Sequence, residues 1–173
     1  MRAGLWSGVV ALLACMGAWL VMLRPYDGPE PSSDWAEVER GLVIDLRPQS
    51  VRWEAFATPE ADGWVPGPTD METLVADLML SADDLAGLGA APRTHDETDA
   101  DWVRVAANSA RPWLAPAHQA LLTRLAGADR QAAWRLANCR GIAVRGLKSK
   151  HDKPAFICID GDRALLHVVL SGP

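Results

Sequence analysis

The sequence predicts an α+β protein with an N-terminal transmembrane helix followed by one exported domain. In that domain, about five short helices lie between an N-terminal strand pair and a C-terminal three-stranded antiparallel meander. Three observations lead to this prediction: an uncharged apolar run at the start, helix-capping signals in the middle, and strand-like alternation at the end. The 173 residues are enough for one compact domain and too few for two large ones.

The apolar run covers residues 3–23, which are 21 consecutive positions without a charge between Arg2 and Arg24. A helix of that length spans about 30 Å, the thickness of the hydrocarbon core of a bilayer. Trp6 and Trp19 lie toward its two ends, where indole rings favour the headgroup level. Positive charge precedes the run and acidic residues soon follow it, so the positive-inside rule favours a cytoplasmic N-terminus. We therefore expect a single-pass protein of the inner (cytoplasmic) membrane with its C-terminal domain on the exported side.

The predicted organisation has three parts: a transmembrane signal anchor (1–24), a Pro-rich linker (25–40) and an exported α+β domain (41–173). Two other fates of the N-terminal segment stay open. A cleaved signal peptide needs only about 7–15 apolar residues, and this run is longer. The stretch Leu12–Cys15 fits the signal of a bacterial lipoprotein, in which Cys15 would be acylated, although the chain then continues apolar. All three fates place the domain outside the cytoplasm.

The exported part begins with two predicted strands. Residues 41–46 are largely apolar and are ended by Pro48, and residues 51–56 alternate in the manner of a half-buried strand. Residues 58–68 hold three prolines and two glycines, which predicts a loop.

Helical signals follow. Residues 69–72 and 81–84 have the capping-box pattern, and the first box precedes apolar residues at helical spacing, namely Met71, Leu74, Val75 and Leu78. The second box opens a short helix that Gly87 or Gly89 ends. Three more helices are predicted over about residues 99–109, 115–126 and 129–138. Residues 141–149, 155–160 and 163–170 then predict the three strands of the meander.

Acidic and basic residues are distributed unevenly along the chain, whose net charge is −5. Residues 1–101 carry a net charge of −12, and residues 102–173 carry one of +7. The meander region holds a basic set: Arg140, Arg145, Lys148, Lys150, Lys153 and Arg163. Either this set docks an acidic protein, a polyanion or anionic headgroups, or the two halves face each other in the fold and neutralise internally. An exported, acidic chain without a reading motif predicts no nucleic-acid partner.

Cys139 and Cys158 are the only cysteines of the predicted domain, which would meet oxidising conditions outside the cytoplasm. A bridge between them would close a loop of about 20 residues and stabilise the fold by about 3 kcal/mol on the chain-entropy model. A simple hairpin that turns near His151 would place Cys158 opposite about Arg145, so the bridge requires the chain to fold back at Gly141. Two separately buried thiols are the alternative.

The sequence contains no motif for a cofactor, a nucleotide, a metal or a catalytic constellation. The four histidines are dispersed, without the close spacing of a zinc site, and His167 lies in an apolar run that predicts a core position. An enzyme with a dispersed site would draw on Cys139, Cys158, His167 and Asp160, and no local signature supports that arrangement. We therefore expect no catalytic, cofactor-binding or metal-binding residues.

The chain has eight tryptophans against two phenylalanines and one tyrosine. Two belong to the apolar run, and Trp53, Trp102 and Trp134 lie at apolar positions of predicted elements. The other three lie in or beside Pro-rich loops, where tryptophan either anchors an interface or folds back over the ends of the domain: Trp35, Trp64 and Trp113.

Together these features predict a single-pass membrane protein whose exported (periplasmic) domain binds other proteins, as an accessory or assembly subunit of a membrane or envelope complex. Residues 3–23 would contact the membrane. The candidate interface residues are Trp35, Trp64, Trp113, Arg145, Lys148, Lys150 and Lys153. The alternatives are a lipoprotein acylated at Cys15 that binds a ligand or peptide, and the enzyme with a dispersed site.

Overall fold

The computed structural model describes residues 29–58, 71–90, 105–128, 130–147 and 152–171. Its helices are α2 (Trp35–Glu39), α3 (Ala82–Ala90), the short 3-10 helix η1 (Ala107–Ser109), α4 (Pro116–Leu125) and α5 (Arg130–Leu136). Its strands are β1 (Leu42–Val43), β2 (Ser50–Thr58), β3 (Met71–Met79), β4 (Cys139–Gly141), β5 (Val144–Gly146), β6 (Asp152–Lys153), β7 (Ala155–Asp160) and β8 (Arg163–Ser171).

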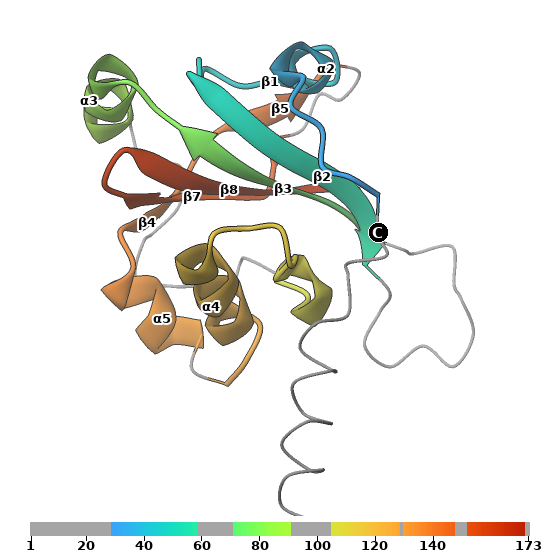
Figure 1. Ribbon diagram of the computed structural model, residues 1–173, viewed down its shortest axis with the longest axis vertical. Coiled ribbons are helices and arrows are strands. Elements are labelled where there is room, and N and C mark those ends of the chain that lie inside the picture. The colour runs from blue at the N-terminus through green and yellow to red at the C-terminus, as the bar shows by residue number, and fades with distance from the viewer. Residues whose placement is uncertain (1–28, 59–70, 91–104, 129, 148–151, 172–173) are drawn as a thin grey trace, which may run out of the picture.

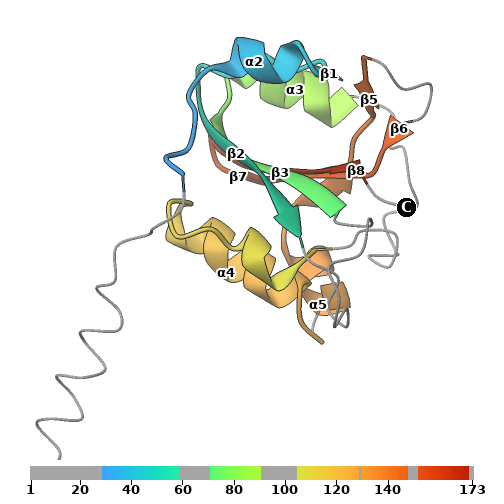
Figure 2. The ribbon, with the colours of Figure 1, turned by 90° about the vertical axis from the view of Figure 1, so that its right-hand side faces the viewer.

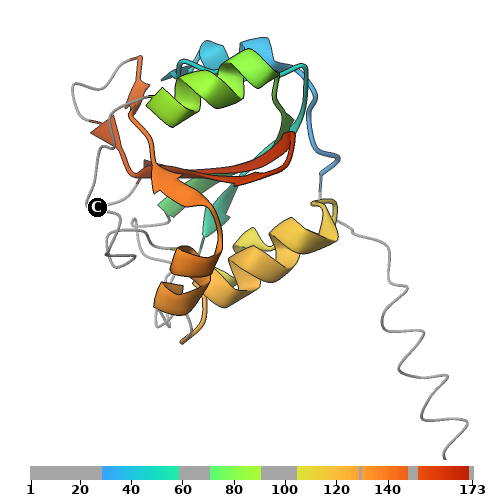
Figure 3. The ribbon, with the colours of Figure 1, turned by 90° about the vertical axis from the view of Figure 1, so that its left-hand side faces the viewer.

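A five-stranded antiparallel sheet forms the middle layer of the domain (Figure 1). Its strand order is β2-β3-β8-β7-β4. A smaller sheet, β1-β5-β6, lies with α2 and α3 over one side of the large sheet, and η1, α4 and α5 cover the other (Figures 2 and 3). We name these two sides the α3 face and the α4 face. Because both faces are covered, the large sheet is the common wall of two cores.

Each face has its own hydrophobic cluster. On the α3 face, Leu74 and Leu166 of the central strands pack with side chains of α2, α3, β1 and β5. On the α4 face, Phe156 of β7 packs with Leu122 of α4 and Trp134 of α5. The rings of Trp134 and Phe156 meet edge to face, with centroids 5.4 Å apart. The predicted core position of Trp134 is thus confirmed.

β3 lies where the sequence predicts the first helix. Residues 73–78 are all buried, because β3 lies between β2 and β8 and both of its faces are covered. A strand buried on both faces loses the alternation of apolar and polar residues, so its apolar side chains can coincide with helical spacing. The prediction of a helix over Met71, Leu74, Val75 and Leu78 is therefore wrong.

Helices occur where the sequence predicts the second, fourth and fifth, at α3, α4 and α5. The capping box before α3 is formed: the Ser81 hydroxyl oxygen accepts from the Asp84 N–H at 3.1 Å, and the Asp84 carboxylate accepts from the Ser81 N–H at 3.3 Å. The helix predicted over residues 99–109 falls largely outside the described residues, and its described end forms η1.

The C-terminal strands do not form a simple meander. β7 and β8 pair as predicted, around Gly161, whose φ of 65° suits glycine at a tight turn. Residues 141–149 were expected to be one strand, but β4 joins the large sheet whereas β5 joins the small one. The alternation of apolar and polar residues could not show that β4 and β5 are two separate strands. Each is only three residues long, and both have a buried first and last residue.

The predicted fold class is therefore corrected. The domain is α+β but consists mostly of strands in two sheets, with four α-helices in the described part of the chain instead of five between two strand groups. None of those described helices is long and apolar enough to cross a membrane. The transmembrane helix predicted for residues 3–23 is thus not supported by the fold, and those residues lie outside the described ranges.

The range assigned to the Pro-rich linker, residues 25–40, contains α2, whose Val38 is buried in the α3-face core. Two tryptophans hold this segment on the domain. The indole N–H of Trp35 donates to the Leu46 carbonyl at 3.2 Å, and that of Trp53 donates to the Asp34 carbonyl at 3.0 Å. The backbones of Ser32 and Trp53 also exchange two hydrogen bonds of 2.8 Å.

Candidate functional site

Two carboxylates are buried between the sheet and the helices of the α4 face. Glu54 lies on β2 and Asp77 on β3, and each side chain is only 4% exposed. The β2–β3 register pairs Arg52 with Asp77 and Glu54 with Val75, which places both carboxylates on the same face in neighbouring rows. A buried carboxylate is costly unless it is paired and hydrogen-bonded, so the partners of these two groups determine how the α4 face is built.

Glu54 is bound by the segment that leads into α4. The Arg111 guanidinium donates from Nε to Oε2 at 2.9 Å and from Nη2 to Oε1, a two-point pair with a carboxylate. The indole N–H of Trp113 donates to the same Oε2 at 2.7 Å. Arg111 also lies over the ring of Phe56, 4.2 Å from its centroid. The loop before α4 is therefore attached to β2 through one carboxylate.

Asp77 is surrounded by three groups, one from β8 and two from the start of α4. Arg163 of β8 donates from Nη2 to Oδ2 at 3.0 Å, and the Ala115 backbone N–H before α4 donates to Oδ2 at 3.4 Å. The His118 Nδ1 of α4 lies 3.7 Å from Oδ1. Burial by itself raises the pKa of Asp77, but the neighbouring His118, Arg163 and Ala115 N–H outweigh it and lower the pKa below 3.8.

The unequal charge of the two chain halves is explained in part by these contacts. Glu54 and Asp77 belong to the acidic half of the chain, and Arg111 and Arg163 belong to the basic half. Two buried carboxylates of the acidic half are therefore neutralised by two arginines of the basic half. The arginines on the outer surface of α4 and α5 are not accounted for by this pairing.

A groove opens beside this network, between α4, α5 and the end of β7, and we name it the α4–α5 groove. Its cavity measures about 390 Å³. Small and aliphatic side chains form most of its walls, and Leu136 at its edge is 76% exposed. Arg124 and Asp160 are its charged lining residues, and His118, whose Nδ1 lies 3.7 Å from Asp77, also lines it.

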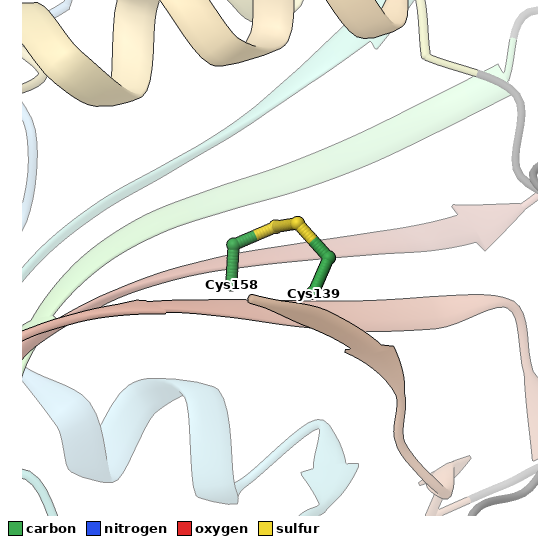
Figure 4. The surroundings of a disulfide bond; sticks show 2 residues. All are labelled: Cys139 and Cys158. Carbon is green, nitrogen blue, oxygen red and sulfur yellow. A yellow bond between two sulfur atoms is a disulfide. The ribbon is translucent and has the colours of Figure 1, made fainter. Parts of the chain in front are cut away.

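The Cys139–Cys158 disulfide forms part of the wall behind the α4–α5 groove. The two cysteines are direct partners on β4 and β7, and the bridge stands on the side of the sheet that faces α4 (Figure 4). The backbone hydrogen bonds Ile159 N–H to Asn138 O and Ile142 N–H to Ala155 O flank the pair, so it occupies a non-hydrogen-bonded position where strands approach most closely. The bridge is confirmed, and the chain leaves the sheet after Gly141 as the pairing requires.

A second cavity, of about 330 Å³, lies on the α3 face between α3, β4 and the segment that follows β1. Its charged lining residues are mainly acidic: Asp45, Asp83, Asp84 and Arg140. Asp84 is engaged with Ser81 at the start of α3, which lowers its pKa through the hydroxyl hydrogen bond. No group of residues in the described ranges is arranged to hold a metal ion.

The predicted interface residues do not gather at one place. Trp35 is half-buried beside α2, and Trp113 is half-buried at Glu54, so the ring nitrogens of both are bonded within the domain. Arg145 is exposed on the small sheet and lies 3.4 Å from the Asp152 carboxylate, and Lys153 follows on β6. Outside the described residues lie Cys15, Trp64, Lys148 and Lys150. The interface assignment therefore stays a prediction for all of them.

The residues of the dispersed enzyme site do not form a catalytic arrangement. Cys139 and Cys158 are bonded to each other, so neither is a free thiol that could act as a nucleophile. His167 is fully buried, stacked on Phe156 with ring centroids 4.9 Å apart, and burial lowers its pKa to about 3. Asp160 lies exposed at the end of β7.

The sequence pattern did not point to the four residues of this buried network, which are Glu54, Asp77, Arg111 and His118. Asp77 was hidden by the predicted helix, on which a carboxylate can face water. In the buried strand that the structure shows, an acid within an apolar run must have a cationic partner, and this is the signal that could have found it. No family model, curated protein or solved structure matches this chain.

The Glu54–Arg111 pair yields a stability prediction. Replacing either partner alone, Glu54→Leu or Arg111→Met, leaves a buried charge without its partner and should lower the free energy of unfolding by about 3–5 kcal/mol. The double variant should lose clearly less than the sum of the two, since both charges are gone. Urea unfolding measures this. Arg145→Met breaks an exposed pair as the matched control and should cost less than about 1 kcal/mol. Additive losses in the double variant would contradict the pairing.

His167 predicts a pH dependence. Its folded pKa of about 3 lies below the unfolded value of about 6.5, so the unfolded chain binds a proton that the folded one does not. The free energy of unfolding should therefore fall by about 1.4 kcal/mol per pH unit between pH 6 and pH 4.5. Asp77, whose pKa lies below 3.8, adds its own loss only at lower pH.

His167→Phe should remove most of this slope, because phenylalanine can keep the stack on Phe156 without a titrating nitrogen. Urea unfolding at several pH values compares the two proteins. An unchanged slope in the variant would show that other groups cause the pH dependence.

Proposed function

We propose that residues 29–171 form an exported, disulfide-containing domain that binds protein partners, as an accessory or assembly subunit of an envelope complex. The α4–α5 groove is its proposed docking site. The observation that carries the proposal is the exposed Leu136 at the edge of an apolar cavity whose back wall is rigidified by the disulfide.

Two features support export. The Cys139–Cys158 bridge forms readily in oxidising compartments and is rare in the cytosol, where thiols are kept reduced. The uncharged residues 3–23 would act as an export signal, whether the signal is cleaved or the chain is cut before Cys15 and Cys15 is acylated. The lipoprotein alternative therefore differs in how the domain is anchored and leaves its location unchanged.

The groove supports binding more strongly than any single exposed side chain. A lone exposed leucine is common on protein surfaces and needs no explanation. Leu136, however, borders a cavity of about 390 Å³ with mostly apolar walls, and cavities of this size and character are typical of binding sites. The other strongly exposed aliphatic residues, Val43 and Leu147, do not line it.

Export is tested by thiol trapping in cells that produce a Cys15→Ser variant of the full chain. After acid quenching and denaturation, Cys139 and Cys158 should resist a maleimide reagent until a reductant is added, because they are bridged. A second variant, from which residues 3–23 are also deleted, is the control and should be labelled at both positions without reductant. Free thiols in the undeleted protein would argue for a reducing compartment.

Docking is tested by photo-crosslinking in cells, with a benzoyl-phenylalanine at Leu136 of the full chain. We expect one discrete adduct that mass spectrometry identifies as the same envelope protein in replicate experiments. The probe at Val43, 53% exposed over the α3 face, is the matched control and should give none. Ala120→Trp, which obstructs the α4–α5 groove from the exposed side of α4, should remove the adduct. Equal adducts from both positions, or none, would contradict docking in the groove.

A further inference from the structure

We infer that the α4–α5 groove receives a short acidic and leucine-rich segment of its protein partner. This inference rests on the proposed function, because it names the chemistry of the partner that would occupy the same groove. It follows from three properties of the groove: the sign of the charge on its helices, the character of its walls, and the position of its single acidic lining residue.

The helices that border the groove are cationic. α4 and α5 contain three arginines, Arg124, Arg130 and Arg135, and no aspartate or glutamate. Arg124 lines the groove and is exposed, and Arg135 is exposed in the last turn of α5. The approach to the groove is therefore positive, and a carboxylate-bearing partner is favoured there.

The walls of the groove select aliphatic side chains. Leu121, Ala133 and Ala137 line it from the two helices, and Ile159 and the disulfide close it from β7. No phenylalanine, tyrosine or tryptophan lines it, and the one ring among its lining residues is the buried imidazole of His118. Exposed Leu136 extends the apolar surface beyond the cavity, which suits a partner that inserts one aliphatic side chain and lays another over the rim.

Asp160 sets the direction of the segment. It lines the groove at the end of β7, whereas Arg124 lines it from the last turn of α4. A carboxylate of the partner would be repelled at Asp160 and attracted at Arg124, so the acidic residues of the segment lie along α4. The groove thus discriminates by repulsion at one end as well as by attraction at the other.

The experiment uses the full chain in detergent and three fluorescein-labelled peptides that differ only in the residues flanking two leucines, which are glutamate, serine or lysine. Fluorescence anisotropy should rank their affinities in that order. Arg124→Glu should weaken the glutamate peptide about tenfold and strengthen the lysine peptide, because the sign of the contact is reversed. Leu136→Asp should weaken the glutamate peptide by a similar factor. Arg40→Glu, at an exposed arginine that caps the end of α2, and Val43→Asp are the matched controls and should change its affinity less than about twofold.

Several outcomes would overturn the inference. One is equal binding, or no binding, of the three peptides; another is an equal effect of Arg40→Glu, which would reduce the preference to net charge. Binding of anionic phospholipid vesicles in place of the glutamate peptide would assign the surface to a membrane. Self-association that Arg124→Glu abolishes would assign it to a second copy. If the Leu136 crosslink persists while the peptides fail, docking stands and only the partner chemistry is wrong; if the crosslink also fails, the proposed function falls with it.

Discussion

The five-stranded sheet is covered on both faces, and most of the domain's features follow from that burial. β3 and β8 have no solvent side, so their residues must be apolar on both faces or must find partners inside the protein. Leu74 and Leu166 meet the first condition on the α3 face. Asp77 meets the second through Arg163, His118 and the N–H of Ala115. The same burial leaves His167 as a neutral imidazole stacked on Phe156.

The buried carboxylates also decide where the helices of the α4 face lie. An apolar helix surface can slide over an apolar sheet at little cost, whereas a paired buried charge has one favourable position. Arg111 and Trp113 converge on Glu54, and the start of α4 converges on Asp77, so the segment is fixed at two points on neighbouring strands. The α4–α5 groove lies beside these fixed points, with the disulfide behind it. Such a support would preorganise the groove proposed as the docking surface, and preorganisation lowers the cost of binding.

The tryptophans of the described part hold segments of the domain together. All four rings provide apolar surface, and the indole N–H of Trp35, Trp53 and Trp113 also donates a hydrogen bond. Trp35 and Trp53 attach the N-terminal segment to the domain, Trp113 binds Glu54, and Trp134 fills the α4-face core. The contacts of Trp35 and Trp113 therefore favour the alternative that these rings fold back over the ends of the domain. An interface role would use the part of each ring that stays exposed. The excess of tryptophan is in good part a matter of holding loops and termini on a small domain.

Local sequence determined those parts of the protein whose signals are local. The capping box at Ser81 and Asp84 forms as predicted, and α4 and α5 lie where the spacing of apolar residues indicated helices. The absence of charged residues from positions 3–23 is read directly from the sequence. Only the tertiary structure decided the rest. Met71–Met79 is a strand because neighbours on both sides and cover on both faces outweigh its capping pattern and helical spacing, and these neighbours lie far away in the sequence. For the same reason the pairing of Glu54 with Arg111, of Asp77 with Arg163, and of Cys139 with Cys158 depended on which strands and loops the fold brings together.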